Sequence, residues 1–275
     1  MPKVAANGIT MHYEQQGAGE PLILIPYLAA DHACYAFQVP EYARHFTTIS
    51  VDLRGTGESD KPSGAYTTEL LADDVAGFMH AMGIARAHVA GLSLGGAVGM
   101  WLAVKHPEKV ASLSVHSGWT RSDRFLHSVV ESWQIVARAV GVPDMIVRAI
   151  FPWCLTPELY AERSDYIDSL AAFVRSRPTQ SVADFLQQSN AVLAHDVEAH
   201  LGRILAPTLI TVGTRDQLTS TRFADRLKGG IRDSELLVFD GCAHAALYER
   251  VEEFNQRTLA FLRRHAGAAG ACEKQ

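Results

Sequence analysis

The residues best suited to chemistry are a serine, an aspartate and a histidine that are far apart in the chain. Ser93 lies in the segment Gly91-Leu92-Ser93-Leu94-Gly95, and Asp216 and His244 lie in loops that each follow a short apolar run. A serine hydroxyl is a weak nucleophile near neutral pH, so it needs a nearby base and a third group that orients the base. These residue types, in this order, predict that Ser93 attacks a carbonyl, His244 takes its proton and Asp216 orients the imidazole.

The segment around Ser93 predicts a sharp turn from a strand into a helix. Residues 87–90 are short and apolar, whereas residues 97–106 have helical periodicity and end at Pro107. A serine in such a turn adopts strained backbone angles, and the flanking glycines let neighbouring backbone pass without a Cβ clash. The helix that follows stabilises negative charge at its N-terminus.

Strands and helices alternate on both sides of this turn. Residues 7–14 predict an outer strand, and residues 69–82, 221–228 and 247–264 have helical periodicity. Further strands are predicted at residues 21–25, 47–51, 110–115, 208–212 and 235–239. We therefore expect an α/β fold with a mostly parallel, doubly wound sheet. Because chemistry in such sheets collects at the carboxyl ends of strands, all three candidate residues would meet there.

The alternation stops between residues 119 and 203, where only helical periodicity is found. We expect a core of residues 1–118 and 204–265, a helical cap of residues 119–203 and a disordered tail of residues 266–275. The cap would cover the carboxyl edge of the sheet and enclose an apolar substrate pocket. The aromatic candidates for its lining are Tyr27, Trp119, Phe125, Trp133 and Trp153.

Other residues offer weaker sites. Asp240 also ends a strand, but its closeness to His244 favours a supporting role in the turn. His195 and His200 lack a third ligand nearby, so we interpret them as surface residues and expect no metal site. The four cysteines have no paired spacing, which favours free thiols. No motif for a nucleotide or another cofactor is found, so no cofactor is expected.

Composition limits the partners. The net charge is -5 and the chain has no basic run, which disfavours nucleic acid and anionic membranes. No targeting segment and no stretch of 18 apolar residues is found. We expect a cytoplasmic protein with a small-molecule partner, and its oligomeric state stays open.

From about residue 19 to residue 265, the chain resembles α/β-hydrolases. The resemblance rests on Gly91–Gly96, Asp52–Ser59, Gly213–Asp216 and Gly241–His244. Within that superfamily the chain is similar to capped carboxylesterases and lactonases, including enol-lactonases and serine-type acyl-homoserine-lactone hydrolases. The resemblance implies an α/β-hydrolase fold with a helical cap.

The resemblance also implies two backbone amides for an oxyanion hole, those of Leu94 and Leu28. The second comes from the loop after a buried strand, where the family usually has His-Gly and this chain has Pro26-Tyr27. Glycine allows backbone angles that tyrosine resists, so this departure bears on the Leu28 amide. An alternative donor is the Tyr27 hydroxyl.

The expected function is hydrolysis of carboxylic esters or lactones through an acyl-enzyme, including acyl-homoserine lactones (quorum quenching). The same three residues also suit a C–C bond hydrolase, a thioesterase or a perhydrolase. A serine at position 93 disfavours haloalkane dehalogenation, which needs a carboxylate nucleophile. An alternative of another class is a non-catalytic ligand receptor with the same fold.

Overall fold

The computed structural model describes residues 2–267. Most of the tail expected to be disordered, residues 268–275, lies outside the described residues. The described chain forms an eight-stranded sheet in the order β1-β2-β4-β3-β5-β6-β7-β8. The pairs β1–β2 and β2–β4 are antiparallel and all the others are parallel, so the predicted α/β fold with a mostly parallel sheet is confirmed.

The strands are β1 (Lys3–Ala6), β2 (Ile9–Gln16), β3 (Pro21–Ile25), β4 (Thr47–Val51), β5 (Ala87–Leu92), β6 (Val110–His116), β7 (Thr208–Gly213) and β8 (Ser234–Phe239). The α-helices are α1 (Val39–Tyr42), α2 (Thr68–Ala81), α3 (Leu94–Lys105), α4 (Arg124–Val140), α5 (Val142–Met145), α6 (Phe151–Cys154), α7 (Pro157–Glu162), α8 (Ser164–Ser176), α9 (Val182–Leu193), α10 (Thr221–Gly230), α11 (Ala246–Glu249) and α12 (Val251–Arg264). Short helical turns of other kinds are η1 (His32–Tyr35), η2 (Pro107–Lys109), η3 (Ile146–Ile150) and η4 (Glu198–Arg203).

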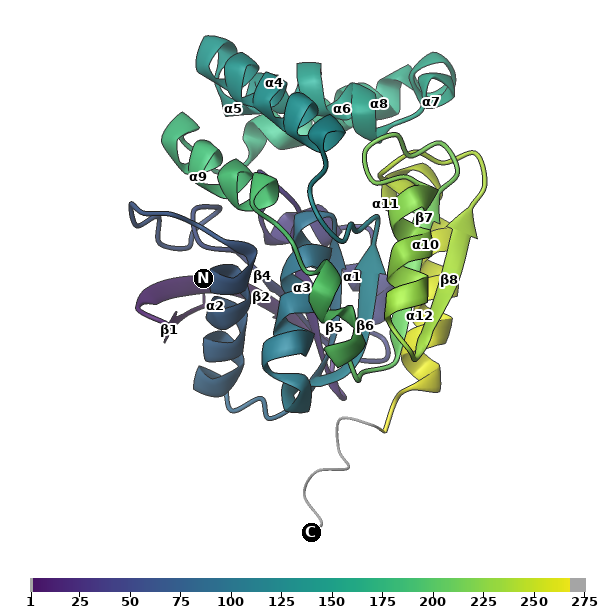
Figure 1. Cartoon of the computed structure of the whole chain (residues 1–275). Helices are drawn as coiled ribbons and strands as arrows, with labels where there is room; N and C mark the ends of the chain where they lie inside the picture. The colour runs from purple at the N-terminus through teal and green to yellow at the C-terminus, as the bar shows by residue number, and fades with distance from the viewer. Residues whose placement is uncertain (1, 268–275) are drawn as a thin grey trace.

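Helices cover both faces of the sheet (Figure 1). Because side chains alternate along a strand, β3 supplies a core on each face. Ile23 and Ile25 join the cluster that includes α2, α3 and α10, whereas Leu22 and Leu24 join the cluster that includes α12. This double burial explains why the central strands read as continuous apolar runs in the sequence.

Between β6 and β7 the chain is helical from α4 to α9, and the one strand-like contact there is an isolated bridge between Arg121 and Asp196. Figure 1 shows α4 to α8 as a layer above the sheet, with α9 lower and beside it. Residues on α4, α8 and α9, including Leu126, Leu170 and Val192, line a cavity that Ser93 also lines. These helices therefore stand over the nucleophile candidate.

Two elements differ from the sequence-based prediction. A first strand, β1, pairs with β2 through a turn in which Asn7 and Gly8 both have positive φ, of 49° and 77°. The helix predicted over residues 247–264 is two helices, because Arg250 leaves helical geometry at φ -135° and ψ 57°. Neither difference moves the ends of the central strands.

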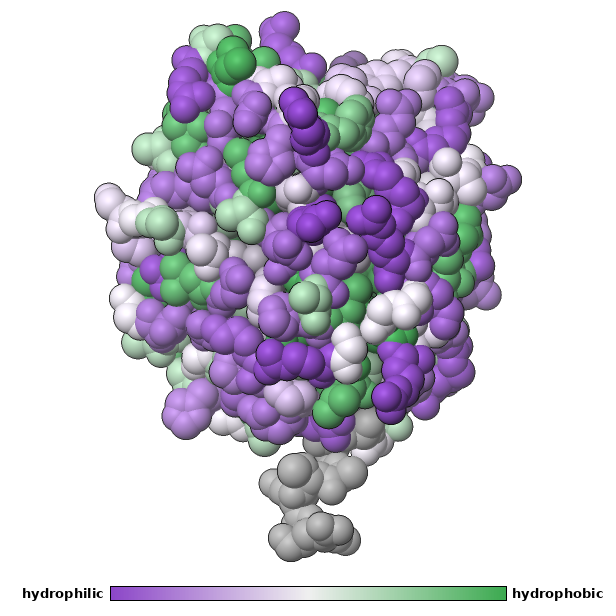
Figure 2. All heavy atoms as spheres, viewed as in Figure 1, coloured by the Kyte–Doolittle hydropathy of each residue, from purple (hydrophilic) through white to green (hydrophobic). Residues whose placement is uncertain are grey.

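Hydrophilic residues predominate on the face shown in Figure 2, and hydrophobic residues are scattered over it. Among residues 2–267, no helix combines the length and the apolar character that crossing a membrane requires.

Candidate active site

Ser93 occupies the strained junction between β5 and α3. Its backbone has φ 54° and ψ -118°, a conformation that residues with a side chain rarely adopt. Two hydrogen bonds hold it, from the Ser93 N–H to the His116 carbonyl (2.8 Å) and from the Ala97 N–H to the Ser93 carbonyl (3.0 Å). Strain of this kind persists only where the surroundings enforce it, and it is common at active sites.

The glycines on either side of Ser93 are required by close backbone approach. A Cβ at Gly91 would lie 2.2 Å from the Gly95 carbonyl oxygen, and one at Gly95 would lie 2.1 Å from the Ile25 carbonyl oxygen. The start of α3 is thereby packed directly against the end of β3. This brings Ser93 close to the loop that follows β3.

His244 and Asp216 meet at the ends of β8 and β7. The His244 Nδ1 lies 2.9 Å from the Asp216 Oδ2. The other carboxylate oxygen accepts the N–H groups of Leu218 (2.8 Å) and Thr219 (2.9 Å). Burial acts to raise the pKa of Asp216, but the charge and hydrogen bond of His244 and the Thr219 donors outweigh it and lower the pKa. Asp216 is therefore a buried carboxylate whose contacts favour the ionised form, as an orienting acid requires.

The rival acid has a different environment. Asp240 is exposed, and its Oδ1 accepts a hydrogen bond from the Thr214 hydroxyl at 3.1 Å. The same hydroxyl accepts the Gly241 N–H at 2.8 Å. Asp240 thus supports the turn after β8, and the imidazole of His244 is bonded to Asp216 instead.

The sequence interpretation missed two residues at this site. The Thr219 hydroxyl lies 2.8 Å from the Asp216 Oδ2, 3.2 Å from the His244 Nδ1 and 2.9 Å from the Ser117 carbonyl. The Ser117 hydroxyl donates to the His244 carbonyl at 2.7 Å. Both residues lie after the end of a strand, and this position was the one sequence feature that could have indicated them. Their contacts, however, join residues up to 127 positions apart in the chain. A threonine and a serine without a motif could not be selected from sequence.

Ser93 and His244 line the same cavity. Among residues 2–267, no hydrogen bond joins the Ser93 hydroxyl to the His244 ring. In enzymes without substrate, such catalytic hydrogen bonds are often long and tighten in the complex. The pairing of this nucleophile with this base therefore stays a prediction.

The two candidate oxyanion amides flank Ser93. Leu94 begins α3, and Leu28 lies in the loop after β3 and lines the cavity. Neither N–H has an acceptor among residues 2–267. Ala29, the residue after Leu28, has a positive φ of 62°, a backbone conformation that glycine adopts most readily. The Ala29 N–H donates to the Gln188 Oε1 of α9 at 2.9 Å, which ties this loop to the overlying helices.

The alternative oxyanion donor, the Tyr27 hydroxyl, already has a partner. The Tyr248 hydroxyl donates to the Cys34 carbonyl at 2.7 Å, which uses its single proton. Tyr248 must therefore accept at its 2.8 Å contact with the Tyr27 hydroxyl, and Tyr27 donates to Tyr248. Burial raises the pKa of Tyr27, so the hydroxyl stays protonated and engaged in this chain of hydrogen bonds.

The cavity has a volume of about 240 Å³ and mainly apolar walls. Of the five aromatic candidates, Tyr27, Trp119 and Trp133 line it. The expectation was wrong for Phe125 and Trp153, which do not line the cavity but contact each other edge to face, with centroids 5.8 Å apart. Phe125 is 43% exposed, whereas Leu126, the next residue of α4, is buried and lines the cavity, because consecutive residues of a helix point in different directions.

Histidine burial also corrects one prediction. His195 is not a surface residue: it is 2% exposed, with ring nitrogens 3.0 Å from the Thr68 hydroxyl and 3.2 Å from the Trp119 carbonyl. Burial lowers its pKa to about 4, so the ring is neutral. His200 is half-buried against Trp101, with ring centroids 5.2 Å apart. The cysteines described, Cys34, Cys154 and Cys242, are free thiols whose pKa values are raised by burial.

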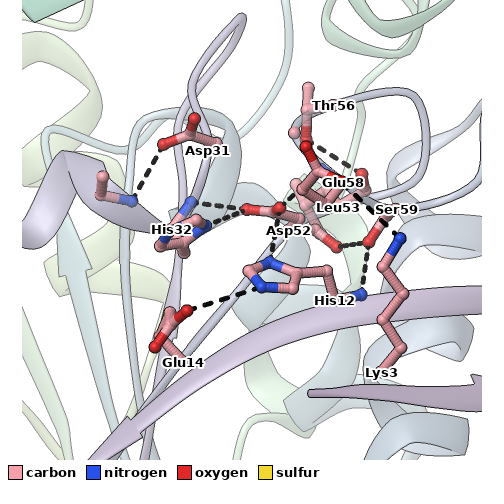
Figure 3. Close-up of polar contacts among 12 residues, drawn as sticks. Lys3, His12, Glu14, Asp31, His32, Asp52, Leu53, Thr56, Glu58 and Ser59 are labelled. Atoms are coloured by element: carbon pink, nitrogen blue, oxygen red, sulfur yellow. Dashed lines mark hydrogen bonds and ion pairs between the residues drawn. The ribbon is translucent and has the colours of Figure 1, made fainter. Parts of the chain in front are cut away.

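Asp52 is the centre of a second polar cluster, drawn in Figure 3. Its Oδ2 accepts the His12 Nδ1–H and the Glu58 N–H, both at 2.9 Å, and its Oδ1 accepts the Nδ1–H (2.8 Å) and backbone N–H (2.7 Å) of His32. The possible metal ligands of His12, His32 and Asp52 lie within 4.8 Å of one another. However, both carboxylate oxygens are filled by donors, and a Cβ at Gly57 would lie 2.1 Å from Oδ2. The contacts describe a packed hydrogen-bond hub that joins the loops after β3 and β4.

Comparison with known proteins agrees with this architecture. The profile of the alpha/beta hydrolase fold family matches residues 20–251. A protein of Azorhizobium caulinodans named "Putative carbamate hydrolase RutD" is 31% identical over 267 residues, which cover 95% of this chain and 98% of the relative.

Two solved structures are similar throughout. The enol-lactonase from Burkholderia xenovorans LB400 has a TM-score of 0.87 and 26% identity, covering 95% of this chain and all of that one. Est816, described as an N-acyl homoserine lactone degrading enzyme, has a TM-score of 0.80 and 26% identity, covering 94% of this chain and all of that one. This chain is a hydrolase that belongs to the alpha/beta hydrolase fold family.

Proposed function

We propose that this hydrolase cleaves carboxylic esters or lactones through an acyl-enzyme on Ser93. The observation that carries the proposal is the bonded pair of His244 and Asp216 in a cavity that a strained serine also lines. The apolar walls favour an acyl chain. We also propose that residues 1–118 and 204–265 act as the catalytic core and residues 119–203 as its cap.

In the proposed mechanism, the Ser93 oxygen attacks the substrate carbonyl while His244 Nε2 takes the hydroxyl proton. Asp216 holds the proton on Nδ1 and stabilises the imidazolium. The oxyanion accepts the N–H groups of Leu94 and Leu28, each worth about 100- to 1000-fold in rate by comparison with other oxyanion holes. The protonated His244 then gives its proton to the leaving alkoxide, which leaves Ser93 acylated.

The second half of the reaction repeats these roles with water. His244 Nε2 takes a proton from water as the water oxygen attacks the acyl carbonyl. Collapse of the tetrahedral intermediate breaks the bond to the Ser93 oxygen, and His244 returns the proton to that oxygen. The products are a carboxylic acid and an alcohol, or one hydroxy acid when the substrate is a lactone.

Rapid mixing with p-nitrophenyl butyrate distinguishes a serine hydrolase from a non-catalytic receptor. A serine hydrolase releases nitrophenolate over many turnovers, and its Ser93→Ala variant should hydrolyse the ester at least 10³-fold more slowly. A receptor binds the ester and releases nothing beyond the uncatalysed background. Parallel assays with N-octanoyl-homoserine lactone and with a phenyl carbamate determine which acyl group reacts fastest. Equal rates for the wild type and Ser93→Ala with all three substrates would overturn the proposal.

A further inference from the structure

The backbone on both sides of His244 is hydrogen-bonded to groups outside its loop. The Ala243 N–H donates to the Glu249 Oε2 at 2.6 Å, and the Ala245 N–H donates to the Cys154 carbonyl at 3.0 Å. Glu249 is a half-buried residue of α11, whereas Cys154 ends α6 in the helical layer above the sheet. The position of the base therefore depends on a carboxylate and on the proposed cap.

The Glu249 carboxylate also binds the proposed cap directly. Its other oxygen, Oε1, accepts the N–H of Thr156, the residue before α7, at 2.6 Å. Each oxygen thus has one backbone donor, one from the cap and one from the loop of the base. Thr156 and Ala243 are both buried, so an N–H that loses the carboxylate is left poorly solvated, which is unfavourable.

A second contact links the cap to the loop of the orienting acid. Arg215, next to Asp216, forms an ion pair with Glu158 of α7. Both side chains of this pair are exposed, and exposed ion pairs contribute little to stability. Glu249 is the stronger link, because its two partners are buried N–H groups and hydrogen bonds to a charged group are stronger than neutral ones.

We propose that Glu249 is a positioning residue, which sets the orientation of His244 by holding the Ala243 N–H while the Thr156 N–H fixes the carboxylate. This inference rests on the proposed function, in which His244 takes the Ser93 proton. Glu249 does not line the cavity and acts through the backbone. A displacement of about 1 Å can cost about 100-fold in rate. The loss of Glu249 should therefore appear in kcat and not in KM.

The first test is steady-state hydrolysis of p-nitrophenyl butyrate. Glu249→Leu removes both acceptors and should lower kcat about 10- to 100-fold, with KM changed by less than about threefold. Glu249→Gln must direct its NH₂ at one of the two N–H donors, so it should lower kcat about tenfold. The matched controls are Glu253→Leu and Glu253→Gln, because the Glu253 side chain is 48% exposed and pairs with Arg257 instead. Both should keep kcat within about twofold of the wild type.

Removing one of the two donors should rescue the glutamine variant. Thr156 has φ -73° and ψ 148°, and Leu155 has φ -124° and ψ 146°, which suit a proline and the residue before it. Thr156→Pro therefore deletes the N–H with the backbone unchanged. In that background the glutamine oxygen can accept the Ala243 N–H, so Glu249→Gln should lower kcat by less than about twofold.

The control for this rescue is Thr156→Ala, which removes the hydroxyl and keeps the N–H. Glu249→Gln should still lower kcat about tenfold in that background. A loss of the same size in the Thr156→Pro and Thr156→Ala backgrounds would overturn the assignment.

Proton NMR separates this inference from the proposed function. The low-field resonance of the His244 Nδ1–H, identified by its absence in His244→Ala, reports the hydrogen bond to Asp216 without turnover. We expect Glu249→Leu to shift or broaden it and Glu253→Leu to leave it unchanged; Glu249→Gln serves if Glu249→Leu does not fold. If the wild type hydrolyses no ester, the proposed function fails and this resonance alone decides the role of Glu249. An unchanged resonance in the folded Glu249 variant, or an effect confined to KM or to thermal stability, would show that Glu249 does not position the base.

Discussion

Replacing Asp216 with asparagine should disable the base with little change to the fold. In the wild type, Oδ1 accepts two N–H groups, from Leu218 and Thr219. The asparagine must therefore keep its oxygen there and direct its NH₂ toward the His244 Nδ1. The Thr219 hydroxyl can accept from that NH₂ while it donates to the Ser117 carbonyl. The variant thus retains a complete set of hydrogen bonds.

The expected loss of activity in Asp216→Asn follows from the tautomer of His244. With an NH₂ facing it, the His244 Nδ1 becomes an acceptor and the ring proton moves to Nε2, so Nε2 cannot take the Ser93 proton. The equivalent change in serine proteases lowers kcat about 10⁴-fold, which corresponds to about 5.5 kcal/mol of transition-state free energy. We expect a loss of similar size in kcat/KM for p-nitrophenyl butyrate, with an unchanged circular dichroism spectrum.

The matched control is Asp240→Asn, which changes the exposed acid of the β8 turn in the same way and should alter kcat/KM by less than about twofold. A loss below tenfold in Asp216→Asn, or a larger loss in Asp240→Asn, would refute the assignment of Asp216.

Three further predictions concern supporting residues. Thr219→Val removes one donor from Asp216 and should lower kcat about tenfold, whereas Thr219→Ser should restore it; equal kcat values for the two variants would contradict a role for the hydroxyl. Gln188→Leu leaves the Ala29 N–H without its acceptor, so steady-state kinetics should show kcat reduced about tenfold with KM little changed; a change in KM alone would show that the oxyanion loop does not depend on this tether. Asp52→Asn should lower the free energy of unfolding by about 3 kcal/mol in urea titrations at pH 5.5 and by less at pH 9. A larger decrease at pH 9 than at pH 5.5 would contradict the directions of the His32 and Asp52 pKa shifts.

The sign of the Asp52 prediction follows from two pKa shifts. Burial acts to lower the pKa of His32, but the hydrogen bond and charge of Asp52 outweigh it and raise the pKa. The stability that protonated His32 contributes is complete below the pKa of about 6.5 in the unfolded chain. It is lost as the pH rises through the higher pKa that His32 has in the folded protein. Burial acts to raise the pKa of Asp52, but the His32 and Glu58 donors lower it. The contribution of Asp52 is therefore present above a pH of about 4, so both contributions are present at pH 5.5.

Sequence patterns were sufficient where the signal is local. Buried parallel strands read as apolar runs, and the bounds predicted for β3 and β4 are those observed. The Gly91–Gly95 turn was predictable because close backbone approach leaves only glycine at two fixed positions. The pairing of His244 with Asp216 followed from the rule that loops after parallel strands share one edge of the sheet.

Long-range packing explains what was missed. The ring of His195 is buried because Thr68, 127 positions away, offers it a hydroxyl, and no pattern in the sequence marks that contact. Helical periodicity identifies an apolar face, but it does not tell which aromatic on α4 faces a cavity, so Trp133 and Phe125 were indistinguishable.

The central claim is that Ser93 is activated by its neighbours to attack carbonyl carbon. The most direct measurement is labelling with a fluorophosphonate probe, followed by peptide mass spectrometry to locate the adduct. We predict one adduct per chain, on the Ser93 oxygen, formed at least 10³-fold more slowly in Asp216→Asn. An adduct on another residue, or ester hydrolysis that persists in protein fully labelled on Ser93, would contradict the account.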